Sequence, residues 1–387
     1  MGTKNYAYVN CEMLKWARER TPIKIEDIPI RVKDISSEQI ENWENGIEYP
    51  SINQAKKLCN LYDIPFAALY LTDLPNEDKT QYIDRRTYKD GLDADISYEL
   101  WKEINRLKSC RECAKELLDI DGYENSIERI AEDIEEKSIP SKVRDIFDIK
   151  TPFKNKTAYN NSAFNFFRSK IEAKGIMVLQ IESISIKELR GLSLNFDILP
   201  IIAVNKSDSD RAKVFTLFHE MAHLIRRTSN LCLIDFNERE DDEEKICNNL
   251  AADILIPEDE LDSVLNGKNL DDDKEITRLS DRYAVSKFVI IKRLYDLNRI
   301  DFTVYKNKYE KYLNNFNEIK ELKKNQGKNI VVTQDKKLIS SSGKLYPKIV
   351  LDAYYEGKIS FGEVCNTLNI NSRYIENVER MVMFSEW

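Results

Sequence analysis

The sequence predicts an α+β fold that is mainly helical, and two patterns lead to this prediction. Three short apolar runs, at 175–181, 192–196 and 199–205, have the length of strands and follow one another closely. Longer segments before and after them repeat apolar residues at helical spacing, most clearly from Arg211 to Arg227. Strands followed by helices in this order favour a small sheet packed against helices.

Length and composition bound the class of protein. The 387 residues are enough for two or three domains, and 42% apolar with 33% charged residues is typical of a protein with real cores in water. No apolar run approaches the roughly 20 residues that span a bilayer, and the N-terminus lacks the apolar core of a signal peptide. The seven scattered cysteines favour reduced thiols. We therefore expect a cytoplasmic protein that does not contact membranes.

The organisation predicted along the chain has four parts. Residues 1–74 read as a compact helical domain, and 75–125 as a linker dominated by a long helix. Residues 126–300 contain the strand-like runs and the helix that follows them. Residues 301–387 read as a mostly helical C-terminal module, either structural or partner-binding, that carries no chemistry.

Within the N-terminal domain, Glu26–Gly46 fits a helix-turn-helix pattern. Four polar residues near its second helix could read DNA bases: Ser36, Ser37, Gln39 and Asn42. However, basic residues do not outnumber acidic ones in this domain, and DNA binding depends on cationic contacts to phosphate. Two interpretations stay open, DNA binding or a degenerate domain that docks a partner or the enzyme itself.

The chain has only two histidines, and both lie in the string His219-Glu-Met-Ala-His223. A helix brings residues four apart onto one face, so both imidazoles can bind one zinc ion. Glu220 lies between them, where a metallopeptidase needs the general base that activates a zinc-bound water. The pattern therefore predicts a zinc site with Glu220 as the catalytic residue.

A catalytic zinc normally takes three protein ligands, so a third ligand is expected downstream. The acidic run 238–244 offers many carboxylates, most of which we expect in a solvated loop. Glu244 is favoured because it opens a second helical pattern in which Asn248 and Ala251 share its face. Glu243 is the alternative, about 100° further round the helix.

Two features of the site stay open at this stage. Arg226 or a tyrosine could stabilise the oxyanion, and the sequence does not decide between them. The run Leu199–Asn205 could be a sheet edge that pairs with an extended substrate, since Pro200 suits an edge strand, or it could be an ordinary buried strand.

Several stretches in a fixed order resemble the ImmA/IrrE-like metallopeptidases with an N-terminal Xre-type helix-turn-helix domain. They are Glu188–Leu194, Leu199–Asn205, Phe215–Leu224 and Glu244–Pro257. The resemblance implies a zincin-like metallopeptidase domain in which Zn²⁺ is bound by His219, His223 and Glu244, with Glu220 as the base. It also implies that the pattern Leu279–Leu294, similar to a second helix-turn-helix, packs structurally against the peptidase core.

The resemblance further implies a regulatory zinc endopeptidase that cleaves a helix-turn-helix repressor and so controls stress-response or mobile-element genes. The alternative is a transcriptional regulator, or an antitoxin-like partner of a neighbouring-gene toxin, that keeps a zinc site with little proteolysis. An intact Glu220 favours the enzyme, because a purely structural zinc needs no base between its ligands. The expected partners are a protein substrate, DNA through the N-terminal domain, a toxin, or a second copy of the chain.

Overall fold

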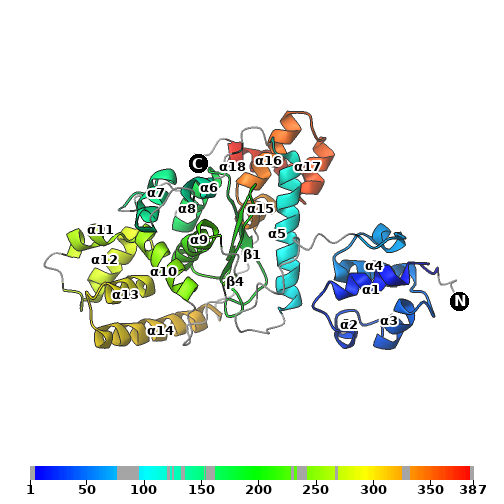
Figure 1. Ribbon diagram of the computed structural model, residues 1–387, viewed down its shortest axis with the longest axis horizontal. Coiled ribbons are helices and arrows are strands. Elements are labelled where there is room, and N and C mark those ends of the chain that lie inside the picture. Colours follow the sequence, from blue (N-terminus) through cyan, green and yellow to red (C-terminus); the bar gives the residue numbers. More distant parts are fainter. Residues whose placement is uncertain are drawn as a thin grey trace. The chain divides into compact units, whose positions relative to one another are not determined.

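In the computed structural model of the chain (Figure 1), the described residues are 5–75, 96–119, 123, 126–131, 136–151, 153, 162–227, 231–232, 242–265, 269–324 and 332–383. The chain forms two compact units, Met1–Arg106 and Leu107–Trp387. Most described elements are helices, and the described strands form one small mixed sheet in the second unit. The mainly helical α+β prediction is confirmed.

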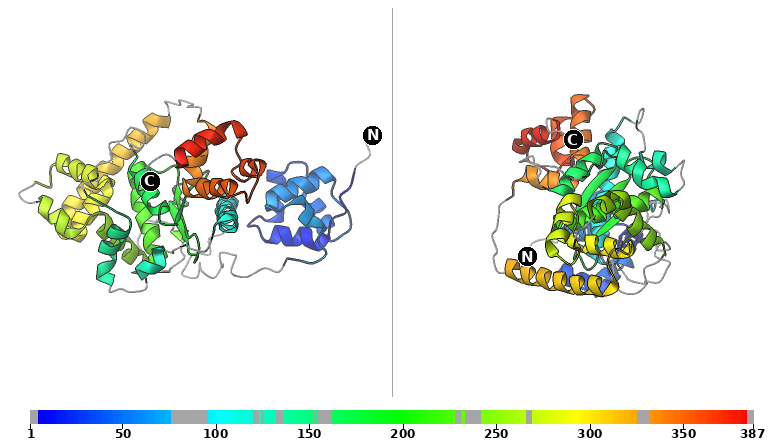
Figure 2. Two further views of the ribbon diagram at one scale, coloured as in Figure 1. Left: turned by 90° about the horizontal axis from the view of Figure 1, so that it is seen from above. Right: turned by 90° about the vertical axis from the view of Figure 1, so that its left-hand side faces the viewer.

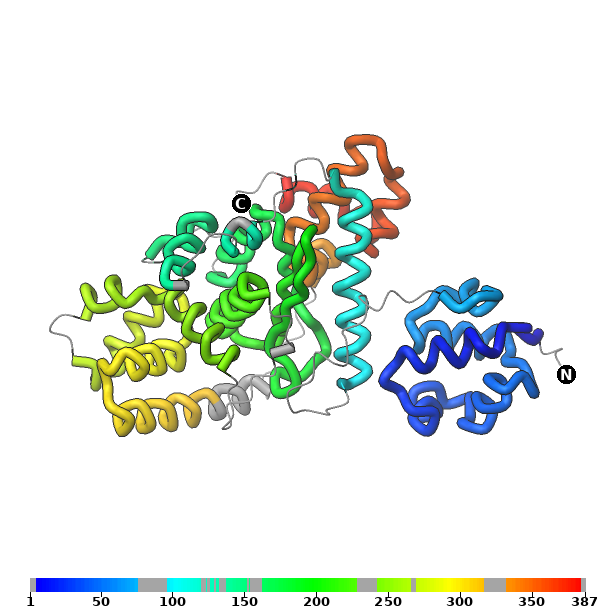
Figure 3. Tube along the Cα trace, in the orientation of Figure 1, coloured from blue at the N-terminus to red at the C-terminus, as the bar shows by residue number. Residues whose placement is uncertain are grey.

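Within residues 5–75, the first unit packs four short helices around one apolar core (Figure 3). They are α1 Cys11–Glu19, α2 Ile28–Arg31, α3 Ser37–Glu44 and α4 Ile52–Tyr62, with 3-10 helices at Ile25–Asp27 and Phe66–Tyr70. Ile40 and Trp43 are apolar positions of the pattern Glu26–Gly46, and both are buried on α3. The assignment of this unit as a helix-turn-helix domain stays a prediction.

The sheet of the second unit has the strand order β1-β3-β2-β4. The strands are β1 Met177–Ile181, β2 Gly191–Leu194, β3 Ile201–Asn205 and β4 Leu231–Cys232. β3 pairs parallel with β1 and antiparallel with β2, and β2 pairs antiparallel with β4. The strand that leads to the histidine helix is therefore central.

This order decides between the two interpretations of Leu199–Asn205: the segment is an ordinary buried strand and not a sheet edge. All five residues of β3 are buried, and both of its sides are occupied by neighbouring strands. Pro200 lies just before β3, so its missing N–H removes no bond from the ladder, and its carbonyl accepts a bond from Met177 N–H. A proline next to a strand was therefore misleading as a sign of an edge.

Helices α8 (Ala163–Glu172) and α9 (Asp210–Ile225) pack against each other and against the sheet (Figures 1 and 2). α9 contacts β2 and β3, and α10 (Asp242–Leu255) packs along α9. The second half of α5 also belongs to this unit, and α5 is the long helix predicted within residues 75–125. The bounds of α5 and of further helices in this unit are α5 Tyr98–Leu117, α6 Ser126–Ala131, α7 Ile139–Ile146, α11 Glu258–Leu265, α12 Asp273–Tyr283, α13 Lys287–Asp296 and α14 Phe302–Lys324.

Four C-terminal helices, orange to red in Figure 2, gather beside the sheet: α15 Gln334–Ser342, α16 Leu345–Tyr355, α17 Phe361–Thr367 and α18 Ile375–Met383. α15 and α16 contact β1, the strand at one edge of the sheet. α12 and α13 bury Leu279 and Leu294 in the same core as α9, so the second helix-turn-helix-like stretch does pack against this core.

The C-terminal helices belong to the same compact unit as the sheet. The finer boundaries expected at residues 74, 125 and 300 stay predictions. None of the helices in the described part of the chain is both long and apolar enough to cross a membrane.

Candidate metal centre

Both histidines lie on α9, whose start is set by local chemistry. The Ser209 side chain accepts a hydrogen bond from Ala212 N–H and caps the first turn, while Asp210 lies near the positive end of the helix dipole. Three turns later, His219 and His223 share one face and are completely buried. Their Nε2 atoms are 3.2 Å apart.

Glu244 of α10 completes this group from the facing helix. Its Oε2 lies 3.2 Å from Nε2 of His219, and its Oε1 lies 3.4 Å from Nε2 of His223. The Glu244 side chain is 26% exposed, whereas both imidazoles are completely buried. Burial alone would raise the pKa of the Glu244 carboxyl, but the two imidazoles outweigh burial and hold that pKa far below its usual range.

The spacing of these three groups fits a small cation. Zinc–nitrogen and zinc–oxygen bonds of about 2.1 Å in a tetrahedron separate neighbouring ligand atoms by about 3.4 Å. The two Nε2 atoms are 3.2 Å apart, and the nearest carboxylate oxygens of Glu244 lie 3.2 Å from His219 (Oε2) and 3.4 Å from His223 (Oε1). Two neutral imidazoles and one carboxylate also form a donor set known from catalytic zinc sites. The residues present therefore fit a metal ion held by His219, His223 and Glu244.

The neighbouring acidic residue has a different partner. Glu243 accepts hydrogen bonds from Arg226, one of them 2.9 Å from Nη2 to Oε2. This bidentate pair holds the Glu243 carboxylate at the end of α9, so the structure places Glu244, and not Glu243, against both imidazoles. Residues 238–241 of the acidic run lie outside the described residues. The same pair engages Arg226, which the sequence left open as an oxyanion donor.

Glu220 is also completely buried, and its carboxylate lies against the start of β2. A Cβ at Gly191 would lie 2.7 Å from Oε1 of Glu220 and 2.5 Å from Cγ2 of Thr216. Both distances are too short for any side chain, so only glycine permits this approach of α9 to the strand. The sequence did not predict that Gly191 makes room for the Glu220 side chain.

A buried thiol lies behind His223 and was also missed. Sγ of Cys247 is 3.5 Å from Nδ1 of His223. Burial raises the pKa of this thiol. The available signal was its place on α10, three residues after Glu244, which puts it on the same side of the helix.

The polar residues predicted to read DNA are engaged within the first unit. Ser36 and Gln39 form a capping box at the start of α3, in which each side chain accepts a bond from the other residue's N–H. The Ser37 hydroxyl donates to the carbonyl of Ile25 at 3.3 Å. Asn42 is partly buried on the same helix. Three of these four side chains are therefore engaged in local structure.

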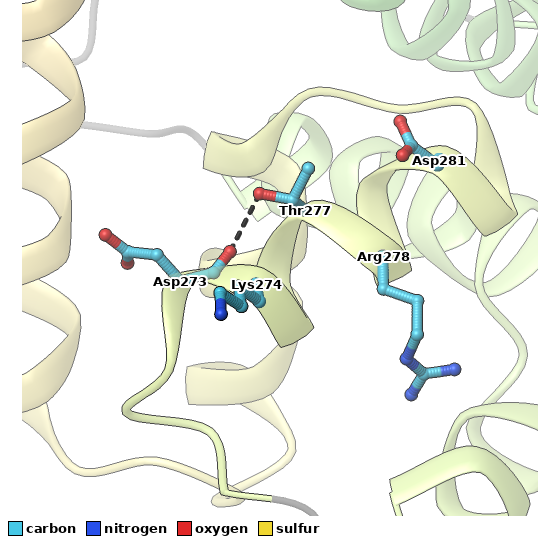
Figure 4. A pocket seen from close by; sticks show the side chains of 5 residues that line it. All are labelled: Asp273, Lys274, Thr277, Arg278 and Asp281. Carbon is cyan, nitrogen blue, oxygen red and sulfur yellow. Dashed lines mark hydrogen bonds between the residues drawn. The ribbon is translucent and has the colours of Figure 1, made fainter.

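A shallow hollow on α12 lies apart from these groups (Figure 4). It is lined by Asp273, Lys274, Thr277, Arg278 and Asp281. All five come from one helix, and the Thr277 hydroxyl donates to the Asp273 carbonyl at 2.7 Å. Its charges are mixed and it includes none of the candidate metal-binding residues.

The comparisons with known proteins point to the same region of the chain. Residues 171–295 match the family model Peptidase_M78, described as an IrrE N-terminal-like domain. The match contains both histidines, Glu220 and Glu244 but takes in less than half of the chain. No curated protein and no solved structure matches. The chain therefore contains an IrrE-like peptidase-family domain, in which His219, His223 and Glu244 are a possible metal site.

Proposed function

We propose that the protein is a zinc-dependent endopeptidase in which His219, His223 and Glu244 bind the metal and Glu220 is the general base. The observation that carries this proposal is the convergence of three side chains inside the segment that matches a peptidase family. The two Nε2 atoms are 3.2 Å apart, and each lies within 3.4 Å of one carboxylate oxygen of Glu244. A structural zinc site would normally be closed by four protein ligands. Three ligands and an adjacent carboxylate suit catalysis.

The metal ion and the residues around its position have different roles in the proposed reaction. A zinc ion bound there would lower the pKa of a coordinated water towards neutrality and polarise a peptide carbonyl. Glu220 takes the proton from the attacking water as the new C–O bond forms, and then returns it to the nitrogen of the leaving fragment as the peptide C–N bond breaks. Gly191 leaves the space that this carboxylate occupies.

The proposed substrate is a helix-turn-helix repressor, cleaved at a specific site to control stress-response or mobile-element genes. The first unit would then recruit protein rather than DNA. Two observations favour this role. Ser36, Ser37 and Gln39, which were candidates for reading bases, form hydrogen bonds at the start of α3. Tyr8, Ile30 and Ile47 are largely exposed, as apolar residues of a protein-binding surface would be. If the unit instead binds DNA, its affinity will fall steeply as salt is raised.

The test mixes the zinc-loaded protein with the product of the adjacent gene, tested as the candidate repressor, and follows intact masses over time. Discrete fragments that form with wild type, but not with Glu220→Gln, support the proposal and identify the cut site. A stable complex without fragments would contradict proteolysis and favour the alternative of a regulator or antitoxin-like binding protein. If the bound partner is a toxin and not a repressor, the antitoxin-like interpretation is favoured.

A further inference from the structure

Cys247 is a buried thiol on α10 that lies directly behind the candidate metal centre. Its Sγ is 3.5 Å from Nδ1 of His223 and 3.9 Å from Oε1 of Glu243. It is completely buried and follows Glu244 by three residues on the same helix. Cys247 therefore lies beside the Nδ1 atom of His223, which is the nitrogen of that proposed ligand that faces away from the metal. It also lies beside the carboxylate of Glu243, the residue before the proposed ligand Glu244.

The chemistry of each group decides where the hydrogens lie in the series of contacts from Arg226 through Glu243 and Cys247 to His223. Arg226 donates to Glu243, and an ionised carboxylate can only accept. The thiol hydrogen of Cys247 therefore points towards Glu243, and its sulfur can accept the Nδ1–H of His223. That tautomer of the imidazole leaves the lone pair of Nε2 directed at the metal position.

We propose that Cys247 is a positioning residue, which holds the imidazole of His223 in the tautomer and orientation that bind the metal. A ligating histidine usually donates its second nitrogen to a carboxylate, a carbonyl or water. Here a thiol stands between the imidazole and the carboxylate of Glu243. Because sulfur is a weak acceptor, it fixes the geometry of His223 while transmitting less of the carboxylate's charge. This inference rests on the proposed function, since it assumes a metal at the centre.

His223, Glu243 and Cys247 are also close enough to hold a metal ion themselves. We favour the positioning role because the Arg226 guanidinium already binds the carboxylate of Glu243 at 2.9 Å. A cation in that second position would lie beside a fixed positive charge. The two roles differ in stoichiometry, since only a second site would give the wild type two equivalents of bound zinc.

The first test measures zinc affinity by competition with a chromophoric chelator, on the full chain. Cys247→Ala should bind zinc about 10- to 100-fold more weakly than wild type. Cys247→Ser should recover most of that loss, because a hydroxyl can accept from Nδ1 and donate to the carboxylate. Cys59→Ala removes a buried thiol from the first unit and should bind zinc like wild type.

The second test observes the imidazole N–H resonances of the zinc-loaded protein by NMR, which two histidines make tractable. Both Cys247 variants should move the Nδ1–H resonance of His223 while that of His219 stays in place. If Cys247→Ala does not fold, Cys247→Ser alone decides, because its acceptor changes from sulfur to oxygen.

Three results would overturn the inference: unchanged affinity and resonance in both Cys247 variants, equal losses in Cys59→Ala, or a second zinc equivalent that Cys247→Ala loses. A wild type that binds no zinc would overturn the proposed function as well. Normal zinc binding by wild type together with normal binding by Cys247→Ala would overturn this inference alone.

Discussion

The helices α9 and α3 both carry polar residues that the sequence marked as functional, and the structure treats them differently. On α9, His219 and His223 face a carboxylate from another helix, α10. On α3, Ser36 and Gln39 satisfy the backbone of their own helix. The backbone N–H groups of mid-helix residues already donate to carbonyls of the preceding turn, whereas the first N–H groups of a helix are free for a side-chain cap. The polar residues at the start of α3 therefore serve as a helix cap, whereas those within α9 are available to meet a side chain from another helix.

The largest effect is expected for Glu220→Gln on α9, which removes the proposed base but keeps the shape of the side chain. Loss of general-base catalysis should lower the cleavage rate by about 10²- to 10⁴-fold. Zinc content should stay near one equivalent, because Glu220 is not among the three converging ligands. Mass spectrometry of the substrate and metal analysis of the protein measure both quantities. Cleavage at the wild-type rate would remove Glu220 from the mechanism.

Glu244→Ala tests whether the partner from α10 matters as much as the two histidines. Losing one of three ligands should weaken zinc binding by more than about 100-fold, since even residues behind the ligands contribute 10- to 100-fold. Asp242→Ala is the matched control, because the Asp242 side chain is 95% exposed two residues earlier on the same helix. Equal affinity in the two variants, measured by chelator competition, would mean that Glu244 is not a ligand.

Gly191→Ala probes the contact between α9 and β2 without touching a ligand. The added methyl would meet Oε1 of Glu220 at 2.7 Å and Cγ2 of Thr216 at 2.5 Å, so the carboxylate must shift. We expect a fall of about tenfold or more in kcat, as small displacements of catalytic groups are costly, while zinc affinity stays close to wild type. Gly362→Ala is the control, because its Cβ would have ordinary space. A similar loss in both variants would argue against the positioning of Glu220 by Gly191.

The smallest expected effect concerns α3, where the polar residues cap the helix. Ser36→Ala should destabilise the first unit by about 1 kcal/mol through loss of the α3 cap. Ser51→Ala removes the equivalent cap of α4 and should cost a similar amount. Urea unfolding of the full chain, followed through Trp43 in the first unit's core, measures both. Loss of specific DNA binding in Ser36→Ala alone, at unchanged stability, would instead make Ser36 a base-reading residue.

Local spacing carried much of the prediction. The helix around His219 and His223, its Ser209 cap and the mainly helical α+β class all follow from residues within a few turns of one another, because helical geometry depends on near neighbours. The burial of Ile40 and Trp43 on α3 likewise agrees with the apolar spacing of the pattern Glu26–Gly46. Local spacing also brought Glu244 into consideration, as the first residue of a second helical pattern.

Only the tertiary structure decided how these helices meet. Glu243 and Glu244 are adjacent in the sequence, and a rotation of about 100° decides which carboxylate faces the histidines. That rotation is set by how α10 packs on α9 and by the pair of Glu243 with Arg226. The central place of β3, the approach of Gly191 to Glu220 and the thiol behind His223 are likewise contacts between segments distant in sequence. Such contacts depend on long-range packing, which no local pattern encodes.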